Sequence, residues 1–205
     1  TRNFIREHVE RHKRTFDPSK LRDYVDVYIN EDKCEEDSLA DTIMAFMPDA
    51  IDTVSLVMLW ALLFVTHDRE IQDKIQREID SVTGGSRKVL FQDKAYMPFT
   101  EATILETYRL SSTVAMTGFH KPRRDAKLAG YDIPEYAHVI ANIYSAHMDE
   151  KMWKDPQVFR PERFLDSDGK VMKTDAVLLF GIGRFAPLSG SILSPAKRAG
   201  VPIDF

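Results

Sequence analysis

The segment from about residue 39 to about residue 66 constrains the fold of this chain more than any other. Beyond Val54 it is apolar on nearly every side of a helix, so we expect a long helix that runs through the middle of the protein. Pro48 lies within this segment and predicts a bend. The most apolar run, residues 56–65, has ten residues, whereas a membrane-spanning helix needs about 20. We therefore expect the buried part of a core helix, and no membrane anchor in this chain.

The rest of the chain predicts more helix than strand. Apolar residues recur at helical spacing between capping and breaking residues, which predicts helices over residues 1–14, 21–29, 68–82 and 100–110. We expect Asp17-Pro18-Ser19 to cap the second of these helices and Thr100 to cap the fourth. Short runs of strand-forming residues alternate with turns over residues 115–146. The predicted fold class is mainly α with a small β-sheet (α+β).

Composition and charge narrow the classes of function. The 205 residues are 43% hydrophobic and 29% charged, as is usual for folded proteins, and the formal net charge is −4. A negative chain without a basic stripe argues against a nucleic-acid partner. Cys34 is the only cysteine, which excludes an internal disulfide. His8 and His12 lie one helical turn apart, and we interpret them as surface residues because no third metal ligand is suggested nearby.

Three motifs follow one another in the second half of the chain. Glu106 and Arg109 share one face of the predicted helix over residues 100–110. Phe159-Arg160-Pro161-Glu162-Arg163-Phe164 comes next, and Phe180-Gly181-Ile182-Gly183-Arg184 opens a glycine turn. The order of these motifs resembles the second half of a cytochrome P-450, a haem-thiolate monooxygenase, of the microsomal animal type. Further residues stand at that family's relative spacing: Ile133-Pro134, Asn142, Ala146-His147, Asp149, Trp153 and Asp155-Pro156.

The resemblance implies a structural role for Glu106. Taken alone, the pair of Glu106 and Arg109 is typical of a surface salt bridge. In the family the carboxylate also binds the arginine of the Pro-Glu-Arg-Phe motif, here Arg163, and the buried triad holds the loop that carries the haem. One carboxylate can accept forked hydrogen bonds from two guanidinium groups, which would fix a loop to a helix.

The resemblance also implies roles for other residues. Asp52 and Thr53 match the acid–alcohol pair that delivers protons during oxygen activation, although in isolation they are typical of a solvated helix face. Lys121 matches an arginine that contacts a haem propionate, and a solvated basic run explains it equally well. Phe180 and Gly183 match the turn that leads to the haem ligand.

The glycine turn departs from the family pattern at the residue that binds the iron. The family has a cysteine where this chain has Pro187, and the neighbouring arginine and glycine are replaced by Phe185 and Ser189. The sequence therefore predicts no metal ligand at this position. Prolines and glycines beyond the turn exclude the long helix that follows in the family. We divide the chain into a partial cytochrome P-450 domain, residues 1–184, and an unrelated or disordered tail, residues 185–205.

Two functions of different kinds follow from these observations. The resemblance implies a haem-dependent monooxygenase that inserts one oxygen atom from dioxygen into a lipophilic small molecule, with electrons from an NADPH-dependent flavoprotein reductase. It places the parent protein at the endoplasmic reticulum membrane, on the cytosolic face, while the missing cysteine predicts an inactive polypeptide. The alternative is a non-catalytic remnant, either a truncated product or a helical module that binds partners without haem.

Overall fold

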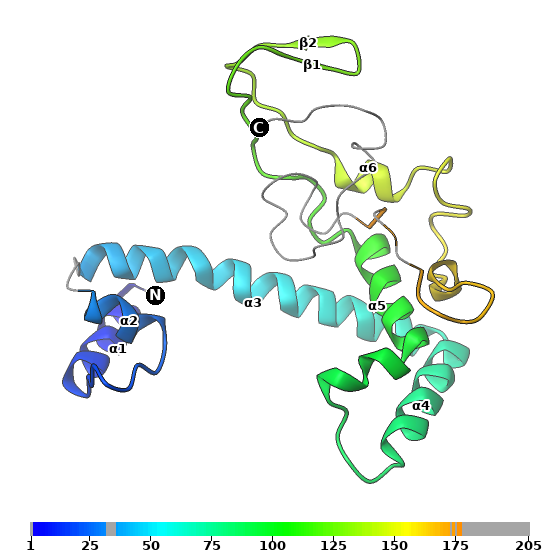
Figure 1. Ribbon diagram of the computed structural model, residues 1–205, viewed down its shortest axis with the longest axis horizontal. Coiled ribbons are helices and arrows are strands. Elements are labelled where there is room, and N and C mark those ends of the chain that lie inside the picture. The colour runs from blue at the N-terminus through cyan, green and yellow to red at the C-terminus, as the bar shows by residue number, and fades with distance from the viewer. Residues whose placement is uncertain (1, 32–35, 173, 175, 178–205) are drawn as a thin grey trace. The chain divides into compact units, whose positions relative to one another are not determined.

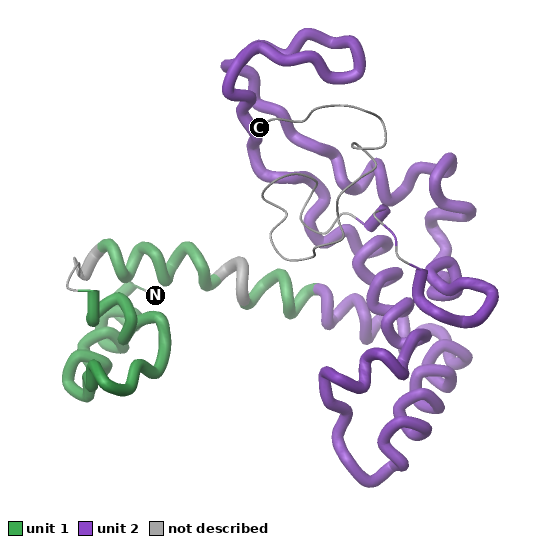
Figure 2. Tube along the Cα trace, in the orientation of Figure 1, with its two compact units in different colours: residues 1–56 green, residues 57–205 purple. Residues whose placement is uncertain are grey.

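The computed structural model describes residues 2–31, 36–172, 174, 176 and 177. Within these ranges helices dominate, and the named strands form a two-stranded antiparallel sheet (Figure 1). This confirms the predicted class, mainly α with a small β-sheet. The chain divides into two compact units, residues 1–56 and residues 57–205 (Figure 2).

The first unit contains α1 (Arg2–Arg14), α2 (Tyr24–Asn30) and the first part of α3 (Glu36–His67). Each helix has an apolar stripe that faces the core, and its other positions are polar or open to solvent. Among the residues that the structure describes, the resulting core has five buried side chains: Ile5, Val9, Val25, Leu39 and Ala40.

The cap of α2 lies later in the chain than predicted. Asp23 precedes the helix, and its Oδ1 accepts hydrogen bonds from the backbone N–H groups of Val25 (3.0 Å) and Asp26 (3.2 Å). Asp17 instead closes a turn by accepting from the N–H (2.9 Å) and the hydroxyl (2.6 Å) of Ser19. Both aspartates can bond to backbone N–H groups two residues on, and the one directly followed by the apolar residues of α2 begins the helix.

The long helix is continuous through the position of the predicted bend. Every backbone position of α3 is helical, so Pro48 does not interrupt it (Figure 1). A proline removes one backbone hydrogen bond, and the bonds on either side extend the helix past it.

The apolar surface of α3 is exposed, and the prediction of a helix buried through the middle of the protein is wrong for this chain. Leu59 and Leu62, near the centre of the apolar run, are 62% and 60% exposed. Neighbours among the described residues cover the helix toward its ends: Leu39 belongs to the first core, and Phe64 stacks on Phe159 with ring centroids 4.5 Å apart. A helix that is apolar on all sides needs neighbours on all sides, which the sequence of the helix alone does not guarantee.

One further property of α3 concerns membranes. The part of the helix that spans Ser38–His67 is long and apolar enough to cross a bilayer. Its most apolar run, residues 56–65, is too short to do so by itself. Core helices of soluble proteins satisfy the same criteria of length and composition, so this observation is weak evidence for a membrane span.

The second unit continues with α4 (Arg69–Thr83), η1 (Phe91–Tyr96) and α5 (Pro98–Ser111). α4 is capped by Asp68 and ends at Gly84, whose φ of 61° is in the left-handed region that favours glycine. α5 begins two residues earlier than predicted, with a proline in its first turn.

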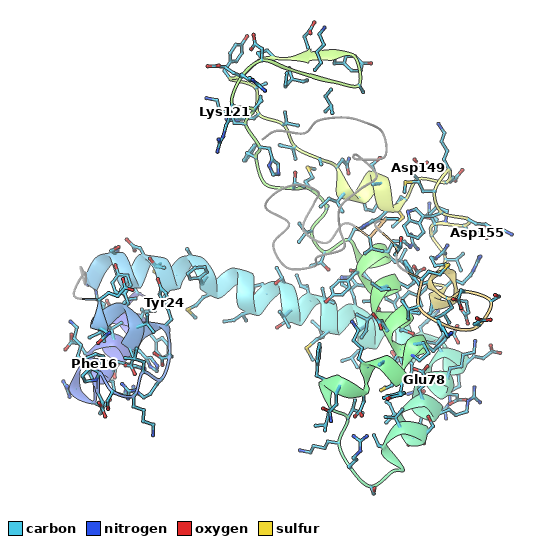
Figure 3. The ribbon with its side chains drawn as sticks, in the orientation of Figure 1. Phe16, Tyr24, Glu78, Lys121, Asp149 and Asp155 are labelled. Carbon is cyan, nitrogen blue, oxygen red and sulfur yellow. The ribbon has the colours of Figure 1, made fainter. Side chains whose placement is uncertain are left out.

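Glu78 of α4 caps α5 from the neighbouring helix. Its carboxylate accepts hydrogen bonds from the N–H of Phe99 (2.7 Å), the N–H of Thr100 (2.8 Å) and the hydroxyl of Thr100 (2.7 Å). Thr100, predicted to be the cap, therefore lies inside the first turn and is bound by the capping group. A carboxylate at a helix N-terminus also interacts favourably with the helix dipole, so Glu78, which Figure 3 labels, fixes α5 to α4.

The small sheet is a hairpin of β1 (Ala126–Leu128) and β2 (Tyr131–Ile133). Ala129 and Gly130 join the strands with φ values of 49° and 88°, which is typical of a two-residue turn that follows the twist of the strands. The chain then returns to a short helix, α6 (Ile143–His147), which the sequence did not predict.

Candidate functional site

The candidate site is built around the carboxylate of Glu106 on α5. Glu106 and Arg109 are both 0% exposed and lie on the same helix face. Arg109 donates from Nε to Oε2 at 2.7 Å and from Nη2 to Oε1 at 2.9 Å, which is a forked, charge-assisted pair. The pair is therefore buried, unlike the exposed salt bridge that this spacing alone favours.

A second arginine reaches the same carboxylate from η2 (Pro161–Phe164). Arg163 donates from Nε to Glu106 Oε1 at 3.0 Å, and the backbone N–H of Arg160 donates to that oxygen at 2.9 Å. The structure thus brings Glu106, Arg109 and Arg163 together, although Arg163 lies 57 positions beyond Glu106 in the sequence. Hydrogen bonds from three residues occupy the carboxylate, which is the condition for burying a charge without a large penalty.

Arg163 also holds the loop that precedes η2. Its Nη1 donates to the carbonyl of Lys154 at 2.9 Å, and its Nη2 donates to the carbonyls of Asp155 (3.2 Å) and Val158 (3.0 Å). Asp155, labelled in Figure 3, has a φ of 50°, a left-handed conformation that residues other than glycine seldom adopt. One guanidinium group therefore ties a strained turn to the carboxylate of α5.

The other residues of η2 fix the same segment through different contacts. Pro161 is buried in the first turn, where the N–H group that proline lacks would have no partner within the helix. The carboxylate of Glu162 accepts from Nζ of Lys74 on α4 at 2.6 Å. Phe164 is 1% exposed and meets the ring of Trp153 edge-on, with centroids 5.7 Å apart and ring planes at 61°. All four residues of η2 thus contribute to its attachment.

The ring of Trp153 connects this apolar contact to the charges. The guanidinium carbon of Arg109 lies 5.2 Å from the ring centroid, and that of Arg163 lies 6.0 Å away. Both distances are in the range of cation–π attraction. The tryptophan therefore covers the two cations and belongs to the core cluster beside them.

Arg109 makes one further contact that the sequence did not indicate. Its Nη1 donates to the backbone carbonyl of His147 at 2.7 Å, and Nδ1 of that histidine lies 3.0 Å from Ser112 Oγ. Burial, together with the charge of Arg109, lowers the pKa of His147 to about 4. The imidazole is therefore neutral at physiological pH, and it forms part of the scaffold around the triad.

The remaining predicted site residues lie elsewhere in the chain. Asp52 and Thr53 belong to α3 in the first unit, where Asp52 is exposed and Thr53 is half-buried. Lys121 is exposed on the segment that leads to the hairpin (Figure 3). Other positions named above fall outside the described residues: Cys34, Phe180, Gly183, Pro187 and the tail of residues 185–205.

Comparison with known proteins identifies the family. Residues 1–185 match the family model described as cytochrome P-450. The chain belongs to the cytochrome P-450 family.

Individual relatives agree with this assignment. The chain is similar to cytochrome P-450 18a1 of Drosophila melanogaster, with 37% identity over 196 residues, which cover 88% of this chain and 36% of the relative. Cytochrome P-450 2U1 of Rattus norvegicus is 35% identical over 191 residues, covering 88% of this chain and 36% of the relative. Cytochrome P-450 1A1 of Homo sapiens is 34% identical over 197 residues, covering 89% of this chain and 38% of the relative.

The chain spans little more than a third of the length of the curated relatives that it matches, between 36% and 38% in these three cases. The matched part includes α3, the helix pair of α4 and α5, and the triad around Glu106. The family and the mainly helical fold are therefore shown for this chain, whereas the activity of a whole cytochrome P-450 is a proposal.

Proposed function

We propose that this chain is the scaffold-bearing part of a haem-dependent monooxygenase, which inserts one oxygen atom from dioxygen into a lipophilic small molecule. We further propose that the polypeptide as it stands is inactive. The observation that carries the first proposal is the buried carboxylate of Glu106 with Arg109 and Arg163 bound to it. These hydrogen bonds attach a loop to a helix, so the task of the triad is structural.

Polar residues outside the triad would serve the chemistry in the complete enzyme. Asp52 and Thr53 would hold and pass on protons, since a carboxylate and a hydroxyl can each accept and release one. The support for these two roles is the match of Asp52 and Thr53 to the acid–alcohol pair of the family. Lys121 would offer a positive charge to a haem propionate, and Phe180 and Gly183 would belong to the turn beside the haem.

The donor groups of this chain do not fit a thiolate-ligated haem. Pro187 occupies the position of the family's cysteine, and Cys34 is the only cysteine. Beyond Met172 the sequence contains no histidine, methionine, tyrosine or cysteine that could replace it. His147, the last histidine, is buried with its ring bonded to Ser112. The turn of this polypeptide therefore has no thiolate with which to bind haem iron.

Membership of the family supports proposals for the partners of the complete enzyme. We propose a lipophilic small-molecule substrate, and an NADPH-dependent flavoprotein reductase as the electron donor. We propose the endoplasmic reticulum membrane, on its cytosolic face, as the location of the parent protein. The net charge of −4 supports the expectation that no nucleic acid is bound.

Hemin titration tests the proposed inactivity directly. We expect that the purified chain, mixed with hemin, reduced and exposed to carbon monoxide, gives no thiolate-type Soret band, because no cysteine follows the glycine turn. The variant Pro187→Cys should also fail, since Phe185 and Ser189 still replace the arginine and glycine of the turn. Stoichiometric, saturable binding by the unmodified chain with a thiolate-type spectrum would contradict the proposal.

The exposed surface of α3 favours a second candidate, a helical module that binds partners. Apolar patches of this kind on a folded chain mark interaction surfaces. Light scattering is expected to show a particle larger than the 23.5 kDa of one chain, and the variant Leu59→Glu/Leu62→Glu should shift it toward the monomer. The control Val89→Glu changes an apolar residue, 45% exposed, that lies outside α3. A monomeric unmodified chain, or equal effects of both variants, would count against α3 as a surface that binds a second copy of this chain.

A further inference from the structure

His12 on α1 lies between two hydrogen-bond acceptors. Its Nδ1 is 3.0 Å from the backbone carbonyl oxygen of His8, and its Nε2 is 2.8 Å from Oδ2 of Asp23. The side chain is 12% exposed, so His12 is more covered than the sequence predicted, whereas His8 is exposed as predicted. A carbonyl and an ionised carboxylate can only accept. Neutral imidazole has one N–H group, whereas imidazolium has two, so only the protonated ring satisfies both acceptors.

The second acceptor is ionised for a separate reason. Oδ1 of Asp23 caps α2 by accepting from the N–H groups of Val25 and Asp26 at 3.0 and 3.2 Å. Hydrogen bonds to a carboxylate favour its charged form. Asp23 therefore bonds to α2 through one oxygen and to α1 through the other, and His12 connects the two helices, which pack against each other.

The other charges facing His12 largely neutralise one another. Asp26 is fully buried and accepts from Nε (2.6 Å) and Nη2 (2.8 Å) of Arg22, which lowers the pKa of Asp26 to about 2. Arg22 also donates to the backbone carbonyl of His12 at 3.4 Å. On α1 itself the ring of His8 lies 5.1 Å from the ring of His12.

A metal ion is the competing explanation for this cluster. Ligand atoms of His12, Asp23 and Asp26 lie within 4.8 Å of one another, which is compatible with a divalent cation. Both oxygens of Asp26 are already bound by Arg22, however. The separation of 2.8 Å between Nε2 and Oδ2 is also that of a direct hydrogen bond, whereas two ligands of a tetrahedral zinc ion lie more than about 3 Å apart. The geometry therefore favours a proton over a metal.

We propose that His12 is a pH-dependent clasp: in its protonated form it binds Asp23 and holds α1 against the capped end of α2, and on deprotonation it releases one of its two acceptors. The hydrogen bond to the His8 carbonyl, followed by that to Asp23, raises the pKa of His12 against the opposing effect of burial. The ordinary value is about 6.5. Because the folded-state pKa lies above it, the stabilisation that the proton adds to the clasp is complete below about pH 6.5 and is lost as the pH rises through the raised pKa.

An NMR titration of the full chain tests the charge state. The His12 ring signals, assigned with the variant His12→Gln, are expected to titrate above pH 6.5 and to report protonation of both nitrogens at lower pH. In Asp23→Asn the titration should move down toward the ordinary value. Asparagine caps helices as well as aspartate does, so α2 should remain folded in this variant. A midpoint at or below 6.5 in the unmodified chain, or no change in Asp23→Asn, would overturn the proposal.

Hydrogen exchange tests the mechanical consequence. The amides of the first turn of α2 are expected to lose protection in the unmodified chain as the pH rises through the His12 midpoint, after correction for intrinsic exchange. In His12→Gln, which cannot titrate, protection of the same amides should not change across that range. Equal pH dependence in both chains would refute the clasp. Displacement of the His12 proton by micromolar ZnCl₂ would also refute the clasp, because the cluster would then be a metal site.

Discussion

The variant Glu106→Ala is expected to lower the free energy of unfolding of the second unit by about 3–5 kcal/mol. The substitution leaves two guanidinium groups, with side chains 0% exposed in Arg109 and 8% exposed in Arg163, without the carboxylate that pairs them. It also removes the acceptor of the Arg160 N–H. An exposed ion pair would contribute less than about 1 kcal/mol. The size of the loss therefore distinguishes a buried triad from a surface salt bridge.

Chemical denaturation followed by tryptophan fluorescence measures this change. Trp153 lies 5.2 Å from the guanidinium carbon of Arg109, and the background variant Trp60→Phe removes the other of the two tryptophans. Asp132→Ala is the matched control. Asp132 pairs with Lys127 at 2.8 Å, but both side chains are exposed, and we expect a change within about 0.5 kcal/mol. Equally small losses for the two acidic variants would contradict a structural role for the triad.

The sequence predicted those parts of the fold that depend on local chemistry. α4 and α5 lie within two residues of their predicted bounds, because apolar spacing and breaking residues act over one or two turns. The start of α2 was wrong because two nearby aspartates can each cap a helix. The predicted burial of α3 was wrong because exposure depends on neighbours distant in the sequence. The neighbours found in the described part of the chain cover the helix toward its ends.

The candidate site was partly predictable from the sequence, because one of its contacts depends on local helical spacing. The pairing of Glu106 with Arg109 follows from helical spacing, whereas Arg163 entered only through the resemblance to the family. Three contacts had no signal in the sequence: the N–H of Arg160 on Glu106, the carbonyl of His147 on Arg109, and Glu78 at the start of α5. The first two involve backbone atoms, and a residue type does not encode the partner of a backbone atom. The third joins two helices through Glu78, which the sequence does not distinguish from the three other carboxylates of α4.

The variant Phe164→Ala is expected to cost about 3–5 kcal/mol, measured with the same denaturation assay. Phe164 is 1% exposed and packs with Ala102, Val177 and the ring of Trp153. Removing the ring leaves a cavity between η2 and α5 that these neighbours can fill only in part. Phe91→Ala is the control, since that ring is 91% exposed and its loss should change stability by less than about 0.5 kcal/mol.

Phe164 and Glu106 act on the same attachment, and this leads to a further expectation for the double variant. Phe164 anchors η2 through apolar contacts, and the neighbouring Arg163 anchors it through the carboxylate, so loss of either contact weakens the other. The double variant Glu106→Ala/Phe164→Ala should therefore lose less stability than the sum of the single losses, by about 0.5–3 kcal/mol. Strict additivity would mean that the ion triad and the apolar cluster hold η2 independently. A shortfall would mean that they form one cooperative unit, which is what a scaffold that presents a loop from a helix requires.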